Sequence, residues 1–171
     1  IYIMHYDNIY RYRTFELRHP GDMLKDEIIF KLLKDFVDKR ENKKVLEIGC
    51  GMGHTAAILS KVSSKLVGID ISIEGIKVAK ERVNAEFIIG DSVALPFKDG
   101  SFDCVIMKDV LEHIENDLQA IKETYKVLKD GELLILYVPH SLDDCVSLES
   151  IIKKVFGYTI DDKVGHVRRY R

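Results

Sequence analysis

The chain has 171 residues, of which 46% are apolar, so it is long enough for one domain with a substantial core. Its 26 Lys and Arg nearly balance its 28 Asp and Glu, which gives no global reason to expect nucleic acid or an anionic membrane as partner, although a local patch for RNA stays open. No apolar run approaches the ~20 residues that span a bilayer, no signal-peptide pattern opens the chain, and the three cysteines lack C-x-x-C spacing, so we expect a protein of the reducing cytoplasm without disulfides or a metal site.

The first twenty residues mix tyrosine, histidine and arginine without a clear period. Two interpretations are open: an arm that packs its rings over an edge of a sheet, or a cap that contacts a cofactor or acceptor. The packing interpretation is favoured, because one short arm without a wider basic stripe is a poor signal of nucleic-acid binding. Tyr6 and Tyr10 stay candidates for contact with the substrate.

Residues 22–38 carry apolar side chains at helical spacing and predict an amphipathic helix that covers one face of a sheet. The apolar positions are Leu24, Ile28, Ile29, Leu32, Leu33 and Phe36.

An apolar run at residues 45–48 predicts a buried strand, and it breaks at once into a glycine-rich loop. The loop has Gly49, Gly51 and Gly53 at alternate positions, where glycine allows positive φ and a close approach of the backbone to a ligand. Residues 55–59 predict a helix whose free N–H groups face that ligand. Strand, loop and helix together predict a nucleotide-binding turn.

The charge beside this loop discriminates between nucleotides. Glu47 stands two residues before Gly49, with no Lys or Arg in the loop to offset it. Its carboxylate would repel a pyrophosphate by about 4 kcal/mol, for unit charges ~4 Å apart at an effective dielectric near 20. His54 also stands where a dinucleotide fingerprint needs a small residue. A ligand that carries an ammonium and a sulfonium, S-adenosylmethionine, suits the loop better.

With its acidic residue, spacer and G-x-G-x-G run, this stretch resembles the first motif of class I S-adenosylmethionine-dependent methyltransferases. The resemblance is greatest to the broad methyltransferase domain 11-like type, which has small-molecule and lipid-like acceptors. The resemblance implies that the cofactor is bound by Glu47, Gly49, Cys50, Gly51 and Gly53.

Residues 66–70 predict a second strand that ends in Asp70, about 20 residues after the first glycine, where such a unit presents an acidic tip to the ribose hydroxyls. The alternative is an Asp that only caps the next helix. It is less favoured, because Ser72 is already placed to cap residues 73–82. The resemblance implies that Ile71 lies against the adenine.

Residues 86–90 predict a third strand, followed by Asp91 and Ser92. An Asp-Ser pair after a strand is often only turn chemistry. In the family, however, the corresponding acidic residue and its successor bind the adenine amino group and ring edge. Residues 102–107 predict a fourth, nearly all-apolar strand. The resemblance implies that Lys108, at its end, contacts the methionyl part of the cofactor, mostly through its backbone.

His113, shortly after that strand, is open to two roles. It is a candidate general base, because the unperturbed pKa of imidazole lies near neutrality, or it supports the cofactor loop. Support is favoured, since methyl transfer to an acidic acceptor needs positioning more than a strong base. The strand end also lacks the Pro-Pro-aromatic pattern of methyltransferases that act on amide or nucleobase nitrogens, which argues against that class.

Asn116 and the spacing after it predict a capped helix to residue 128, and residues 132–138 predict a fifth strand. The helix's apolar positions are Leu118, Ile121, Tyr125 and Leu128. His140 either faces the acceptor pocket or is a solvated loop residue. His166 lies two residues before Arg168, as in a family segment whose role varies with the acceptor; a basic, solvated helix start fits equally well.

The alternation of strands and helices from residue 45 to 138 predicts a single α/β domain with a doubly wound, mainly parallel, Rossmann-like sheet in an α/β/α sandwich. We expect an arm and helix over 1–43, a cofactor-binding core over 44–138 and an acceptor-side lid over 139–171. The family's usual C-terminal hairpin would come after Arg171. An all-parallel sheet without it would expose the edge beside the fifth strand, so we expect either that those residues exist beyond Arg171 or that a homodimer or partner subunit covers that edge.

The predicted function is S-adenosylmethionine-dependent methyl transfer to a small-molecule or lipid-like acceptor, with S-adenosylhomocysteine as product. Two rivals stay open. One is a nicotinamide-dependent oxidoreductase on the same kind of sheet, and the other is a non-catalytic subunit that only binds S-adenosylmethionine.

Overall fold

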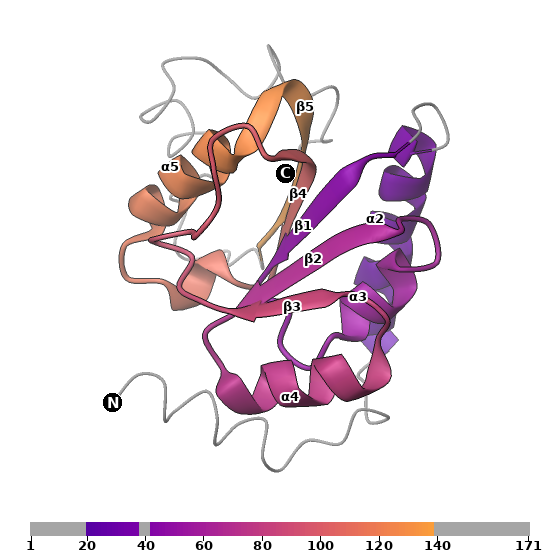
Figure 1. The fold of residues 1–171 in the computed structure, drawn as a ribbon. Coiled ribbons are helices and arrows are strands. Elements are labelled where there is room, and N and C mark those ends of the chain that lie inside the picture. The colour runs from indigo at the N-terminus through magenta and orange to yellow at the C-terminus, as the bar shows by residue number, and fades with distance from the viewer. Residues whose placement is uncertain (1–19, 38–41, 139–171) are drawn as a thin grey trace.

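The structure is a computed structural model, and it describes residues 20–37 and 42–138 (Figure 1). Within these residues, five strands form one sheet in the order β3-β2-β1-β4-β5, and every neighbouring pair is parallel. The predicted doubly wound α/β fold is confirmed. The strands are β1 (Lys44–Ile48), β2 (Lys65–Asp70), β3 (Glu86–Ile89), β4 (Phe102–Lys108) and β5 (Leu128–Tyr137).

Helices connect β1 to β2, β2 to β3 and β4 to β5, whereas residues 90–101 join β3 to β4 without a helix. The helices α4 and α5 begin where the sequence places their caps. The Ser72 hydroxyl accepts a hydrogen bond from the Gly75 N–H at 3.0 Å, and the Asn116 side chain accepts one from the Gln119 N–H at 3.3 Å. Both predicted caps are therefore confirmed. The helices are α2 (Pro20–Val37), α3 (His54–Leu59), α4 (Ile73–Arg82), the short 3-10 helix η1 (Leu111–His113) and α5 (Asp117–Val127).

Two apolar cores lie on opposite faces of the sheet, because successive strand residues point to opposite sides. Val45 packs with α2, α3 and α4 on one face, whereas Leu46 packs with η1 and α5 on the other. Figure 1 shows the sheet between these two groups of helices. None of the helices in the described ranges is long and apolar enough to cross a membrane.

The apolar faces predicted for α2 and α5 are partly wrong. On α2, Leu24, Ile28 and Leu32 are 59%, 43% and 46% exposed, while Ile29 and Leu33 are buried. On α5, Tyr125 is 40% exposed. The cause on α2 is Asp26, which is fully buried and lies on the same side of the helix as Ile29 and Leu33. Its polar contacts turn that side toward the sheet, and apolar spacing alone does not reveal them.

The fifth strand begins four residues earlier than predicted. Residues 129–131 form part of its start, and its pairing with β4 jumps from Phe102 opposite Leu128 to Cys104 opposite Leu133. Such a bulge accommodates a Gly131 with φ +73° inside a strand. Among the described strands β5 is an edge strand, so its cover by a partner or second copy stays a prediction.

Candidate functional site

The carboxyl ends of β1, β2 and β4 meet at one edge of the sheet. The parallel register places Ile48 of β1 between Ile69 of β2 and Met107 of β4. Residues that follow these three positions therefore gather at the same edge: the glycine loop after β1, Asp70 at the end of β2 and Lys108 at the end of β4. The sheet thus brings together three of the strand ends that the sequence singles out.

The glycine loop has a left-handed backbone at all three predicted glycines. Their φ angles are +74° at Gly49, +51° at Gly51 and +80° at Gly53. The N–H groups of Gly49 and Cys50 both donate to the carbonyl oxygen of Ile69, at 2.8 and 3.2 Å, which ties the loop to the second strand. A Cβ on Gly49 would lie only 2.2 Å from Cγ2 of Val110, so both the backbone and the available space require glycine there.

Asp70 holds the loop from the other side. Its Oδ2 accepts a hydrogen bond from the Gly51 N–H at 2.7 Å, and its Oδ1 accepts one from the Ser72 N–H at 2.8 Å. The residue is buried and does not cap α4, a task that Ser72 performs. A carboxylate has about four acceptor sites, so these two bonds are compatible with a hydroxyl ligand on the same group. The predicted ribose contact stays a prediction.

Glu47 is the least satisfied charged group at this edge. The residue is 3% exposed, and its Oε2 has no hydrogen-bond partner in the described part of the chain. Burial raises the pKa of this carboxyl to about 8; the nearby Lys108 opposes the rise, and Asp26 and Asp70 add to it. A buried carboxyl group of this kind either stays protonated or needs a hydrogen-bond donor from a ligand to stabilise its ionised form.

Asp26 is a functional candidate that the sequence reasoning missed. Its Oδ1 accepts hydrogen bonds from the Lys108 Nζ at 2.7 Å and from the Thr55 hydroxyl at 2.8 Å, and the Lys108 Nζ also lies 3.3 Å from that hydroxyl. The available signal was its place three residues before Ile29, on the buried side of an otherwise apolar helix.

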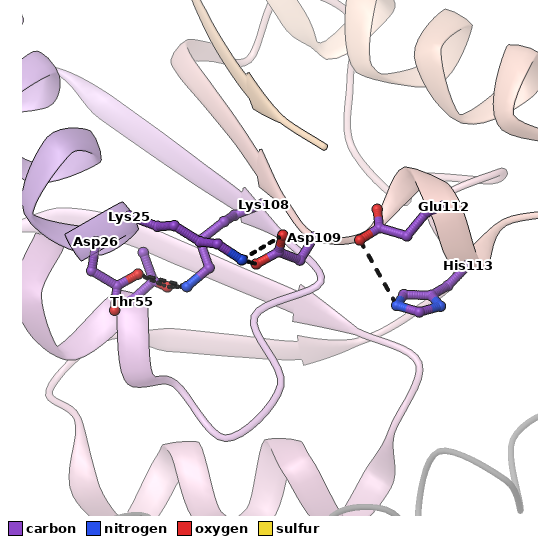
Figure 2. Close-up of polar contacts among 7 residues, drawn as sticks. All are labelled: Lys25, Asp26, Thr55, Lys108, Asp109, Glu112 and His113. Atoms are coloured by element: carbon purple, nitrogen blue, oxygen red, sulfur yellow. Dashed lines mark hydrogen bonds and ion pairs between the residues drawn. The ribbon is translucent and has the colours of Figure 1, made fainter. Parts of the chain in front are cut away.

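The neighbouring residues repeat this contact with the charges exchanged. Lys25 pairs with Asp109 at 2.9 Å, directly beside the pair of Asp26 and Lys108. Figure 2 shows the two pairs side by side, with successive residues of α2 reaching successive residues at the end of β4. The helix is therefore joined to the strand end that the site uses.

The third strand end has a looser structure. The Gly90 N–H donates to the Asp70 carbonyl at 2.9 Å, which brings the start of this loop next to the second strand end. Asp91 is exposed, and its Oδ1 accepts a hydrogen bond from the Val93 N–H at 3.0 Å, so the turn chemistry is present. Ser92 and Ile71 are partly buried. Adenine contacts by Ile71, Asp91 and Ser92 stay predictions.

His113 lies on η1, apart from the Asp26–Lys108 pair in Figure 2. Its side chain is 58% exposed, with Nε2 3.9 Å from Oε1 of Glu112, a carboxyl whose pKa is raised by burial. The choice between general base and support is therefore still open. Tyr6, Tyr10, His140 and His166, with the lid predicted over 139–171, lie outside the described residues.

Within residues 20–37 and 42–138, no group of three His, Cys, Asp or Glu side chains is placed to hold a metal ion. Lys108 lies among the acidic side chains at the strand ends and pairs with Asp26 at 2.7 Å.

Comparison with protein families agrees with this geometry. The model of the methyltransferase domain matches residues 46–136, which include all but the first two residues of β1, the whole of β2, β3 and β4, and all but the last residue of β5. The chain belongs to this methyltransferase family. The resemblance to class I S-adenosylmethionine-dependent methyltransferases noted in the sequence is thereby confirmed.

Relatives in the family differ in how far they have been characterised. The chain is 34% identical to an uncharacterized protein, MJ1252, of Methanocaldococcus jannaschii, over 88% of this chain and 54% of the relative. It is 37% identical to the chloroplastic 2-phytyl-1,4-beta-naphthoquinone methyltransferase of Arabidopsis thaliana, over 70% and 49% respectively. The crystal structure of PH0226 from Pyrococcus horikoshii superposes with a TM-score of 0.64 at 31% identity, covering 76% of this chain and 65% of that one.

The match covers only part of each curated relative. This chain spans 33% of the length of the first of them and 54%, 57% and 49% of the next three.

Proposed function

We propose that this methyltransferase-family chain binds S-adenosylmethionine across the ends of β1, β2, β3 and β4 and transfers its methyl group to a small-molecule or lipid-like acceptor. The supporting observation is Glu47, a buried carboxyl group with an unpartnered oxygen directly before the glycine loop. The ammonium of the cofactor supplies both the missing donor and a favourable charge. A pyrophosphate supplies neither, which argues against the nicotinamide alternative.

The other strand ends fit the rest of the cofactor. Asp70 has acceptor capacity for the ribose hydroxyls and also fixes the loop through Gly51. Asp91 and Ser92 are assigned to the adenine, with Ile71 against its face. The backbone of Lys108 is assigned to the methionyl part, while its ammonium stays with Asp26.

The bound cofactor would supply an electrophilic methyl group on a positively charged sulfur. The chain itself contributes binding and orientation, because the fixed loop and strand ends hold the donor in line with an acceptor nucleophile. Exclusion of water from the buried carboxyl groups strengthens their attraction to the positive charge. Transfer would form the bond between the acceptor and the methyl carbon as the carbon–sulfur bond breaks, with S-adenosylhomocysteine as the leaving product.

The class of acceptor rests on the relatives. One of them is named for a naphthoquinone with a phytyl tail, which supports a lipid-like acceptor here. An acceptor hydroxyl that ionises readily needs little base catalysis, in agreement with the exposed His113.

The test is binding. Excess S-adenosylmethionine at ~100 times its dissociation constant should stabilise the chain by about 2.7 kcal/mol in thermal unfolding, whereas NADH should not. Stabilisation by NADH instead would contradict the proposal. If the chain binds S-adenosylmethionine but methylates none of a panel of quinols and phenols, the binding-subunit alternative gains support.

Asp70→Ala should weaken the affinity for S-adenosylhomocysteine by more than tenfold in calorimetry, because it removes the acceptor that fixes Gly51 and the assigned ribose contact. Asp130→Ala, an exposed carboxylate at the other end of the sheet, is the matched control and should bind as the wild type does. An unchanged affinity in the Asp70 variant would remove that residue from the site.

A further inference from the structure

Three buried carboxyl groups near the strand ends are unequally supplied with hydrogen-bond donors. Asp70 receives two backbone N–H groups. Asp26 receives the Lys108 ammonium and the Thr55 hydroxyl. Glu47 is buried to the same degree, yet its Oε2 receives nothing from the described part of the chain. The Lys108 ammonium, which faces Glu47, is already engaged by Asp26.

The surroundings of Glu47 explain why its charge is unfavourable when no ligand is present. The groups that face it are Lys108 from β4, Asp26 from α2, Asp70 from β2, and Thr55 at the start of α3. Cys50 of the loop adds no charge, because burial, Glu47 and Asp70 all raise the pKa of its thiol. Two of these neighbours are anions and only one is a cation. An acid in such a place is most stable with its proton, in agreement with a carboxyl pKa of about 8.

We propose that Glu47 is neutral in the ligand-free protein and ionises when the cofactor's ammonium arrives, so that binding releases a proton, and that Asp26 is the positioning residue that makes this exchange possible. The inference rests on the proposed cofactor. It goes beyond that proposal because it assigns a task to α2, which lies outside the nucleotide-binding motif.

Asp26 acts through Lys108. It holds the Lys108 Nζ at 2.7 Å, and Thr55 orients the same ammonium from 3.3 Å. Without the Asp26 charge, Glu47 is the nearest group that can supply a negative charge to the Lys108 ammonium. It would then ionise Glu47 before any ligand is present and would repel the incoming ammonium. The pair formed by Asp26 and Lys108 therefore reserves Glu47 for the cofactor.

The sign of the pH dependence follows. Binding removes a proton from Glu47, so raising the pH favours binding until Glu47 is already ionised in the free protein, near pH 8. Below pH 8, each increase of one pH unit should lower the dissociation constant by up to about tenfold. At pH 6.5 the cofactor's own amino group stays protonated, because an α-amino group titrates near pH 8.

Calorimetry measures the proton directly. Binding enthalpies at pH 6.5 in two buffers of different ionisation enthalpy give the number of protons released per ligand. The probes are S-adenosylhomocysteine, which carries the ammonium, and 5′-methylthioadenosine, which lacks the amino-acid end. The proteins are the wild type, Glu47→Gln, Asp26→Asn and the matched control Glu27→Gln, an exposed acid on the same helix.

We expect the wild type and Glu27→Gln to release close to one proton with S-adenosylhomocysteine and close to none with 5′-methylthioadenosine. Glu47→Gln and Asp26→Asn should release close to none with either ligand. Asp26→Asn should also lose most of the increase in affinity between pH 5.5 and 7, which a purely structural role of Asp26 would leave in place.

Several outcomes overturn the proposal. Binding of S-adenosylhomocysteine by the wild type without proton release refutes the role of Glu47, while the proposed cofactor survives. Full proton release in a folded Asp26→Asn refutes the role of Asp26. If circular dichroism shows that this variant does not fold, Lys108→Met decides: loss of the competing cation should leave the release near one proton, and its disappearance overturns the assignment. If the wild type binds neither S-adenosylhomocysteine nor 5′-methylthioadenosine, the proposed function is overturned as well.

Discussion

The two ends of the sheet each bury carboxyl groups beside lysines, with opposite results. At the carboxyl ends of the strands, Glu47 has an unpartnered oxygen and a pKa of about 8. At the amino ends, Asp103 accepts hydrogen bonds from the Lys129 Nζ at 2.8 Å, the Lys43 Nζ at 3.2 Å and the Lys44 N–H at 2.9 Å. Burial alone would raise the pKa of Asp103, but these donors outweigh it and lower the pKa to about 2.

Burial alone does not separate these two acids, since Glu47 is 3% exposed and Asp103 is 6% exposed. The supply of donors does. Ionised Asp103 is held by fixed protein groups and contributes to stability, whereas ionised Glu47 lacks them and reduces it. The difference indicates that the amino ends serve folding, while the carboxyl ends keep an unmet requirement that a ligand can satisfy.

The largest expected effect on unfolding free energy comes from a pair of glycine-to-alanine substitutions, one at each end of the sheet, which distinguish steric clash from backbone strain. Gly49 and Gly131 have nearly the same φ, +74° and +73°, but a Cβ would clash with Val110 at Gly49 and meet nothing within 4 Å at Gly131. Gly131→Ala should cost about 1 kcal/mol of unfolding free energy from the left-handed backbone. Gly49→Ala should cost about 4 kcal/mol, because overpacking adds to the same strain. Urea unfolding measures both.

Val110→Ala in the Gly49→Ala background should recover part of that cost, since it removes the clashing methyl groups. Equal losses at the two glycines would contradict the role of space at the loop.

The next effect concerns Glu47 and stability. The pKa of Glu47 in the folded protein, about 8, lies above the ordinary value of 4.5 for such a carboxyl, so its neutral form stabilises the fold at low pH, and this contribution is lost as the pH rises from about 4.5 to 8. Between pH 5 and 7 the wild type should lose on the order of 3 kcal/mol relative to Glu47→Gln, which has no proton to lose. Denaturant unfolding of both proteins across this range gives the difference, and parallel pH profiles would refute it.

Asp103 should show the opposite slope and a smaller effect. The pKa of Asp103 in the folded protein, about 2, lies below the ordinary value of 3.8 for such a carboxyl, so its contribution is present above pH 3.8 and is lost as the pH falls through 2. Asp103→Asn should therefore cost about 2 kcal/mol at pH 7 and much less near pH 2. Acid titration of the unfolding free energy tests this, and a cost that stays constant with pH would contradict it.

The smallest effect supplies the baseline. Lys77 pairs with Glu74 at 2.8 Å on the surface of α4, where both side chains are largely exposed. Lys77→Ala should change the unfolding free energy by no more than about 0.5 kcal/mol, because exposed ion pairs contribute little. If Lys77→Ala lowered the unfolding free energy as much as Asp103→Asn, the buried hydrogen-bond donors at Asp103 would contribute no more to stability than an exposed ion pair does.

Several parts of the site are visible in the sequence because their signals are local. The glycine spacing predicts a loop with positive φ, and the position of Ser72 after β2 predicts the cap that it forms. The parallel α/β architecture follows from the alternation of elements, whereas the strand order β3-β2-β1-β4-β5 does not, because doubly wound sheets occur with more than one order. The two hydrogen bonds that the Asp70 carboxylate accepts from the Gly51 and Ser72 N–H groups are not visible in the sequence, because the bond to Gly51 depends on how far β2 lies from the loop.

The amino-acid sequence by itself determined that the chain forms a parallel α/β sheet with an acidic residue before a glycine loop, because period, glycine and cap signals act within a few neighbouring residues. Only the tertiary structure decided which side of α2 is buried and what Glu47 meets there. Asp26 and Lys108 are separated by 82 residues, and their contact exists only once the helix packs on the sheet. The charge around a buried acid is set by such long-range contacts, since in a dry interior the nearest donors decide whether the acid ionises.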